Sequence, residues 1–212
     1  LSMTVSASPA YGQANVGMSV EESLAQAAAV CELVGGSLPV DVVVSCAFGS
    51  PYEGDLAPGE VAALGRRLLD GGASSLTYAD TTGVATPRRV AALVDATGID
   101  IGLHLHETRA TGLVNAYAGW QLGVRRFDTS IGGLGGSPFA AGSAGNLATE
   151  ALVHLLDDLD VDTGIDLDRL LEAAALAASL VGHALPSRVA EVGPRGRLTG
   201  PGGQEGDQGA LV

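Results

Sequence analysis

The sequence contains no lysine, and all 11 of its basic residues are arginines. A chain without lysine cannot form the Schiff base of a lysine-dependent aldolase or the lysine linkage of a pyridoxal-phosphate enzyme. It also lacks the lysine that a phosphate-binding P-loop requires. Any chemistry on carbon–carbon bonds would therefore have to use a metal ion or another cofactor.

Cysteine, long apolar runs and net positive charge are also scarce or absent. The two cysteines, Cys31 and Cys46, form neither a disulfide framework nor a Cys-x-x-Cys metal motif, so we expect a reducing, cytoplasmic compartment. No apolar run approaches the ~20 residues of a membrane span, and the first residues show no secretory signal, so we expect no membrane partner. The net charge of -13 argues against nucleic acid as a partner.

What the 212 residues do contain is a regular alternation of short apolar strands and amphipathic helices. Ser19 and Glu22 have the spacing of a capping box and open a segment whose apolar residues follow the helical period. The β-branched run over 40–48 is typical of a strand that is buried on both faces. The pattern predicts strands over 5–8, 40–48, 75–79, 99–106 and 124–131, and helices over 20–34, 58–69, 87–96, 110–122, 146–159 and 166–181.

This alternation predicts an α/β fold with a parallel sheet. The pattern contains five βα units and one extra helix, fewer units than a closed (β/α)8 barrel has. The residues therefore leave two architectures open, a doubly wound open sheet or the C-terminal part of a barrel. Residues 193–212 contain seven Gly and two Pro, so we expect a domain over 1–192 followed by a disordered Gly/Pro-rich tail.

His104 and His106 lie two residues apart at the end of a predicted strand. Side chains alternate along a strand, so both imidazoles point to the same side, at the strand end where parallel α/β folds place their ligand sites. The two rings could share one metal ion, or each could bond to backbone groups in a partly buried position. The pair by itself favours neither alternative.

Other polar residues and glycines follow the predicted strands. Asp80 and Asp128 each lie near a strand end, where a carboxylate can act as a base, support another side chain or cap a helix. Residues 132–138 begin with four glycines in five positions, which make a loop that can approach a ligand closely or is simply flexible. Asn146 and Glu150 are four residues apart on the next predicted helix, with Asn146 either as its cap or as a ligand of a hard cation.

Six segments of the chain match the motifs of one known family. They are residues 15–17 (NVG), 45–54 (SCAFGSPYEG), 80–84 (DTTGV), 102–108 (GLHLHET), 130–140 (SIGGLGGSPFA) and 145–150 (GNLATE). Together they resemble the 3-hydroxy-3-methylglutaryl-CoA (HMG-CoA) lyase family, from about residue 5 to about residue 192. The His-x-His motif fits the whole group of metal-dependent barrel lyases and synthases, whereas the Gly-rich loop and the segment after it are specific to this lyase.

The resemblance implies a (β/α)8 barrel, a divalent cation (Mg or Mn) and cleavage of the acyl-CoA substrate HMG-CoA to acetyl-CoA and acetoacetate. It implies that the metal ligands are His104, His106 and Asn146. It implies that the catalytic groups are Ser137, Asp80, His104 and Glu150, and that the substrate contacts Asn15, Gly135 and Gly136. The phosphates of CoA would need local arginines, such as Arg109 or Arg125.

The sequence departs from the family pattern in two places. Ser137 stands where the family carries a cysteine, and a serine hydroxyl is a far weaker acid than a thiol with a pKa of ~8.5. No segment matches the family's first strand, whose Arg–Asp pair supplies a metal ligand. We therefore expect a partial barrel, truncated at its N-terminus and holding about strands 4 to 8, as a fragment, a shortened gene product or a chain that pairs with another copy in a homo-oligomer such as a dimer.

Two other functions are compatible with these residues. A related acyl-CoA aldolase or a Claisen-type synthase, similar to citramalate and isopropylmalate synthases, would use the same metal ligands, and Ser137 leaves this alternative open. An inactive, truncated remnant that binds acyl-CoA or a partner chain is favoured by the missing Arg–Asp strand. The intact set of His104, His106 and Asn146 opposes that alternative, because a remnant needs no metal ligands.

Overall fold

The computed structural model describes residues 1–136 and 145–195. Five parallel strands form one sheet, and their order across the sheet is their order along the chain. These strands are β1 (Ser2–Ser6), β2 (Asp41–Ser45), β5 (Ser75–Ala79), β6 (Gly102–His104) and β7 (Arg126–Asp128). A small antiparallel hairpin of β3 (Gly49–Ser50) and β4 (Gly54–Asp55) follows β2.

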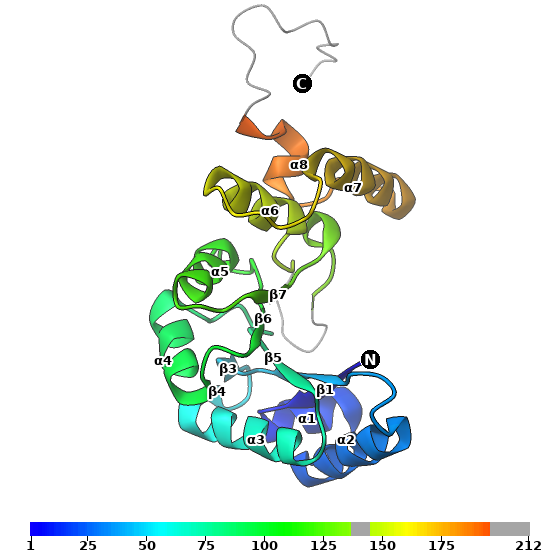
Figure 1. Ribbon diagram of the computed structural model, residues 1–212, viewed down its shortest axis with the longest axis vertical. Coiled ribbons are helices and arrows are strands. Elements are labelled where there is room, and N and C mark those ends of the chain that lie inside the picture. The colour runs from blue at the N-terminus through cyan, green and yellow to red at the C-terminus, as the bar shows by residue number, and fades with distance from the viewer. Residues whose placement is uncertain (137–144, 196–212) are drawn as a thin grey trace, which may run out of the picture.

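Helices connect the strands and cover one side of the sheet. Figure 1 shows α2, α3, α4 and α5 following one another in a curved row outside the strands, with α6, α7 and α8 grouped at one end. The helices are α1 (Pro9–Val16), α2 (Val20–Val34), α3 (Pro58–Asp70), α4 (Pro87–Thr97), α5 (Gly112–Gln121), the 3-10 turn η1 (Ile131–Gly133), α6 (Thr149–Asp158), α7 (Leu167–Val181) and α8 (Arg188–Val192). A doubly wound sheet reverses its strand order and carries helices on both faces, so that alternative is wrong.

The core lies between the sheet and this row of helices. Val42 and Val44 of β2 are fully buried against it, together with helix residues such as Leu68 and Leu93. The opposite face of the sheet is polar, because Asp41 accepts hydrogen bonds there from Thr77 of β5 (2.9 Å) and Arg126 of β7 (3.3 Å). Of the strand predicted over 40–48, Val42 and Val44 are fully buried on the helix side, whereas Asp41 and Val43 on the polar face are half-buried.

Most predicted elements are present, with shorter strands and some shifted ends. The helix predicted over 146–159 begins only at Thr149, after the N-cap residue Ala148, so Asn146 is neither in this helix nor its cap. The hairpin β3–β4 and helix α1 were not predicted. Within the described residues, no helix is long and apolar enough to cross a membrane. The predicted tail beyond Arg195 lies outside the described residues.

Candidate metal and substrate site

The site begins with three register partners at the carboxyl ends of neighbouring strands. Ala79 of β5 pairs with His104 of β6, and His104 pairs with Asp128 of β7. Residues paired in register point to the same face of a sheet, so these three side chains share the polar face. Nδ1 of His104 lies 2.7 Å from Oδ2 of Asp128, and this hydrogen bond from His104 holds the pKa of the Asp128 carboxyl below its usual value.

His106 follows two residues later and brings its ring to the same place. The Nε2 atoms of His104 and His106 are 3.1 Å apart, with the two rings edge to face. The His106 side chain is buried, and this burial, with the charge of His104 as a smaller cause, lowers the pKa of its imidazole to about 4. His106 is therefore neutral at pH 7, the state in which a ring nitrogen can ligate a metal.

The Gly-rich loop places Asn146 beside the two histidines. Asn146 forms an isolated bridge with His106, and its Nδ2 atom donates a hydrogen bond of 2.7 Å to the Leu134 carbonyl. This bond leaves the amide oxygen as the group for a ligand. Gly135 has a positive φ of 105°, and a Cβ atom at this position would lie 2.6 Å from Asn146 Nδ2. Glycine is therefore required at 135 for Asn146 to take this position.

These three side chains fit a divalent cation. Two ligands at right angles on an octahedral ion at ~2.1 Å lie ~3.0 Å apart, close to the 3.1 Å between the two Nε2 atoms. The Asp128 carboxylate supports His104 from its other nitrogen, as is usual for metal-ligating histidines. In the described part of the chain, no three His, Cys, Asp or Glu side chains are placed to hold a metal ion by themselves, so the set depends on the amide oxygen of Asn146 as its third donor.

These groups line an open hollow of about 430 Å³, together with most of the other described residues that were predicted to contact the substrate. Its lining includes His104, His106, Asn146, Asn15, Gly135 and Gly136. Asn15 reaches it from the end of α1, far from the others in sequence. The structure thus brings together the predicted ligands and substrate contacts, while the roles assigned to them stay predictions.

Asp80 lies next to this hollow but does not line it. Its carboxylate accepts hydrogen bonds from the backbone N–H groups of Val84 (2.8 Å) and Ala85 (3.0 Å). Burial raises the pKa of Asp80 to about 6, although these two hydrogen bonds oppose the shift. The structure therefore shows Asp80 holding the loop between β5 and α4, and its predicted catalytic role stays a prediction.

Glu150 is fully buried in the first turn of α6. Both of its carboxylate oxygens accept from the backbone N–H of Gly132, at 2.9 and 3.1 Å. Glu150 thus anchors the turn that leads into the Gly-rich loop, and it is not among the residues that line the hollow. Ser137, the predicted proton donor, lies outside the described residues.

Sequence reasoning missed part of the lining and its support. Thr4 and Tyr11 line the hollow, but the first strand was predicted to begin at residue 5 and α1 was not predicted at all. Glu53 accepts from the Ala10 N–H at 2.9 Å and bonds to the Ser8 hydroxyl that caps α1. If the alternation of side chains along the strand is extended back from Val5, Thr4 falls on the polar face, so its position could have been predicted. No local pattern in the sequence indicates that Glu53 contacts α1.

Comparison with known proteins identifies relatives over most of the chain. The HMGL-like family model matches residues 1–177. An (R)-citramalyl-CoA lyase from Chloroflexus aurantiacus is 39% identical over 91% of this chain and 62% of its own length. The hydroxymethylglutaryl-CoA lyase YngG from Bacillus subtilis is 38% identical over 89% of this chain and 65% of its own length.

Solved structures give the same result. An HMG-CoA lyase from Acinetobacter baumannii, determined in complex with coenzyme A and 3-methylmalate, superposes with a TM-score of 0.87 at 37% identity. The match covers 94% of this chain and 67% of that structure. An HMG-CoA lyase from Bacillus subtilis superposes with a TM-score of 0.85. The chain spans about six-tenths of the length of the curated relatives it matches.

Proposed function

The chain belongs to the HMGL-like family, and we propose that it carries the metal and substrate site of a divalent-metal-dependent carbon–carbon lyase that acts on an acyl-CoA. The observation that carries this proposal is the convergence of His104, His106 and Asn146 on one hollow. The three donors suit Mg²⁺ or Mn²⁺ in a site that also uses water or substrate oxygens. The proposed substrate is HMG-CoA.

The proposed reaction is a retro-Claisen cleavage. The C3 hydroxyl of HMG-CoA loses its proton, the bond between C2 and C3 breaks, and its electron pair moves to C2 as a thioester enolate. C3 becomes the ketone of acetoacetate, and a proton delivered to C2 completes acetyl-CoA. A divalent cation, when bound, would acidify the hydroxyl and hold the substrate oxygens in place.

The side chains of the hollow have separate tasks in this reaction. Asp128 keeps the proton of His104 on Nδ1, so that the lone pair of Nε2 faces the hollow. Asp128 is also the carboxylate that lines the hollow among the described residues, and it is the proposed acceptor of the hydroxyl proton. Asp80 and Glu150 hold the surrounding loops, and Ser137 remains the proposed group that relays a proton to C2.

A second substrate is favoured by a specific observation, the 39% identity to an (R)-citramalyl-CoA lyase. Citramalyl-CoA has one methylene fewer between its carboxylate and the hydroxyl-bearing carbon. The same bond cleavage then gives acetyl-CoA and pyruvate, and the same three donors would serve it. The Claisen-type synthases form such a bond in the opposite direction and remain the third candidate.

We also propose that the five strands correspond to about strands 4 to 8 of a (β/α)8 barrel. The sequential strand order and the single row of helices are those of a barrel wall. In this arrangement the polar face around Asp41 and Arg126 is the barrel interior. The edges of β1 and β7 would pair with further strands of the barrel or with a second copy of the chain.

One assay separates these functions. The purified chain is supplied with Mn²⁺ or Mg²⁺ and with HMG-CoA or (R)-citramalyl-CoA, and acetyl-CoA, acetoacetate and pyruvate are measured. Release of acetoacetate from HMG-CoA is the expected result, and preferential release of pyruvate from citramalyl-CoA would assign the second substrate. Condensation of acetyl-CoA with a 2-oxo acid, without cleavage of either thioester, would instead identify a synthase.

A further inference from the structure

The last step of the proposed cleavage needs an acid that can give a proton to C2. Ser137 is the proposed relay, but a serine hydroxyl is a far weaker acid than the thiol that the family carries there. A relay through this hydroxyl therefore needs a second group that supplies the proton. His104 and His106 are the proposed metal ligands and Asp128 is the proposed proton acceptor, so none of these three is the source.

A phenol is among the groups that line the hollow. The hydroxyl-bearing side chains in its described lining are those of Thr4, Tyr11, Ser45 and Thr81. A phenol has a usual pKa of ~10 and is a far stronger acid than the aliphatic hydroxyls of serine and threonine. Of these four side chains, Tyr11 is therefore the one suited to donate a proton to carbon.

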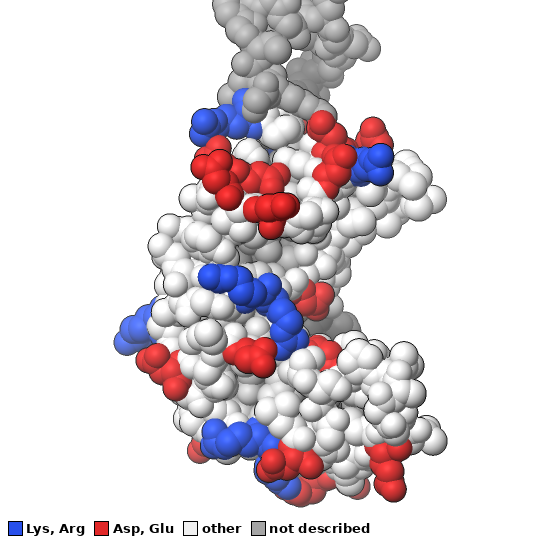
Figure 2. Space-filling model, viewed as in Figure 1, with Lys and Arg blue, Asp and Glu red and all other residues white. Residues whose placement is uncertain are grey.

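Carboxyl groups are numerous in this chain, but they do not supply the acid. Figure 2 shows several acidic side chains over the end that holds α6 to α8. Among the described residues, Asp128 is the carboxylate that lines the hollow. The hydrogen bond from His104 holds the pKa of Asp128 below its usual value. Asp128 therefore enters the reaction ionised, as a base and not as an acid.

The structure holds Tyr11 firmly in the first turn of α1. Tyr11 is only 3% exposed, and its backbone N–H donates to the Ser8 hydroxyl at 3.0 Å. Ser8 bonds in turn to Glu53 of the β3–β4 segment, which also accepts from the Ala10 N–H at 2.9 Å. Asn15, one helical turn after Tyr11, also lines the hollow, so one face of α1 is turned toward it. A proton donor has to be held in place in this way before the reaction begins.

We propose that Tyr11 is the acid of the final step, the source of the proton that C2 receives. The phenol O–H bond breaks, and the electron pair of the enolate forms the new C–H bond at C2. The phenolate then takes a proton from water in the open hollow, while Asp128 returns to water the proton of the C3 hydroxyl, so no net proton is consumed. This assignment rests on the proposed function, since it concerns the same reaction.

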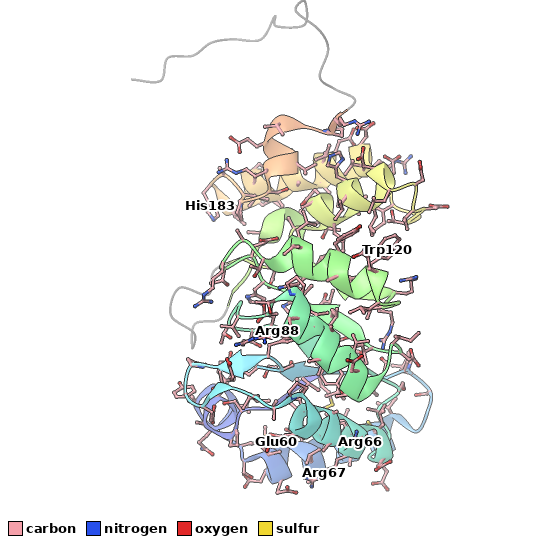
Figure 3. All side chains as sticks on the ribbon, turned by 90° about the vertical axis from the view of Figure 1, so that its left-hand side faces the viewer. Glu60, Arg66, Arg67, Arg88, Trp120 and His183 are labelled. Atoms are coloured by element: carbon pink, nitrogen blue, oxygen red, sulfur yellow. The ribbon has the colours of Figure 1, made fainter. Side chains whose placement is uncertain are left out.

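The first test is Tyr11→Phe, which keeps the ring and removes only the hydroxyl. With the thioester that the chain cleaves, kcat should fall at least ~100-fold while KM and the affinity for Mn²⁺ stay within about twofold, because the lost contribution is that of a general acid. Tyr117→Phe on α5 is the matched control and should change none of these values. The Tyr117 hydroxyl accepts from Gln121 at 2.9 Å and its ring stacks on Trp120, which Figure 3 shows in the outer row of helices.

The second test follows the proton itself. By microscopic reversibility, the acid that protonates C2 must, as its conjugate base, remove a proton from the methyl group of acetyl-CoA. Acetyl-CoA kept in ²H₂O with the chain and Mn²⁺ should therefore gain deuterium, measured by mass, and with Tyr11→Phe at least ~100-fold more slowly. Ser137→Cys added to Tyr11→Phe should restore the exchange at least about tenfold, because a thiol with a pKa of ~8.5 is itself a competent acid.

The outcomes separate this assignment from the proposed function. Cleavage and exchange that Tyr11→Phe retains would overturn the assignment and leave the lyase proposal intact. A loss of Mn²⁺ binding in Tyr11→Phe, or a loss of exchange that Ser137→Cys does not restore, would show that the phenol only shapes the site. Exchange that depends on Tyr11, in a chain that cleaves neither thioester, would support the acid and refute the lyase. A chain that neither cleaves nor exchanges would refute both.

Discussion

His104 and Asp128 are register partners on neighbouring strands, and their side chains meet at 2.7 Å across the polar face of the sheet. This contact orients the His104 ring so that its Nε2 atom faces Nε2 of His106 at 3.1 Å. The metal site therefore depends on strand register as well as on the His-x-His spacing.

The first prediction concerns the support of His104. Asp128→Asn keeps the shape of the side chain but removes the charge that holds the His104 proton on Nδ1. We expect the affinity for Mn²⁺, measured by calorimetric titration, to fall ~10–100-fold. The melting temperature should change little, because the Asp128 side chain is 57% exposed. Asp157→Asn on α6 is the control, and equal Mn²⁺ affinities in both variants would contradict the prediction.

The second prediction concerns the ligand itself. His106→Ala removes one of the two imidazoles, so the affinity for Mn²⁺ should fall at least ~100-fold. Release of acetyl-CoA should be lost with the metal. His183→Ala removes an exposed histidine beyond the end of α7 and should affect neither. Retention of Mn²⁺ binding by His106→Ala would mean that the histidine pair is structural.

The third prediction concerns Gly135, which is needed for the position of Asn146. Gly135→Ala would place a Cβ atom 2.6 Å from Asn146 Nδ2, and the side chain of Asn146 would have to move. Gly164→Ala is a matched control, since Gly164 also has a positive φ but a Cβ atom added there would meet nothing within 4 Å. Both variants should lose about 1 kcal/mol of stability from backbone strain. Only Gly135→Ala should also weaken Mn²⁺ binding, and a similar loss in Gly164→Ala would count against the role of Asn146.

The fourth prediction is a pH dependence with two opposing parts. The pKa of His106 falls from 6.5 to about 4 on folding, so the unfolded chain binds more protons in this range and stability rises with pH. The pKa of Asp80 rises from 3.8 to about 6, so the folded chain binds more protons there and stability falls with pH. Each effect amounts to about 3 kcal/mol at most, and the two largely cancel.

Single variants should separate the two effects. In chelator, Asp80→Asn should become more stable as the pH rises from 4 to 6.5, because Asp80 no longer opposes the His106 effect. His106→Asn should show the opposite slope between pH 4 and 6. Urea unfolding at several pH values measures both. Parallel pH profiles of the two variants would show that these side chains do not have the environments described here.

The local pattern predicted the regular elements well. β5 over Ser75–Ala79 and α2 over Val20–Val34 are confirmed residue for residue, since turn residues bound the first and the capping box of Ser19 with Gly35 bounds the second. The sheet's parallel topology followed from the same alternation. The periodicity of apolar residues carries no information on which strands are neighbours in the sheet. It therefore could not distinguish a doubly wound sheet from one with sequential strand order.

Long-range contacts explain what the pattern missed. Asn146 lies outside α6 because it bridges His106, 40 residues away in sequence, and helix propensity does not register such a contact. Asp80 and Glu150 were predicted as catalytic from the resemblance, and only the structure shows their carboxylates bonded to the loop backbones. The catalytic roles of Asp80, Glu150 and Ser137 stay predictions.

The most direct test of the account is the release of acetyl-CoA from HMG-CoA and from (R)-citramalyl-CoA by this 212-residue chain, with Mn²⁺ and with a chelator. The account predicts release that the chelator abolishes, that added Mn²⁺ restores and that His106→Ala lacks. Release that persists in the chelator, or that His106→Ala retains, would contradict the metal site proposed at His104, His106 and Asn146.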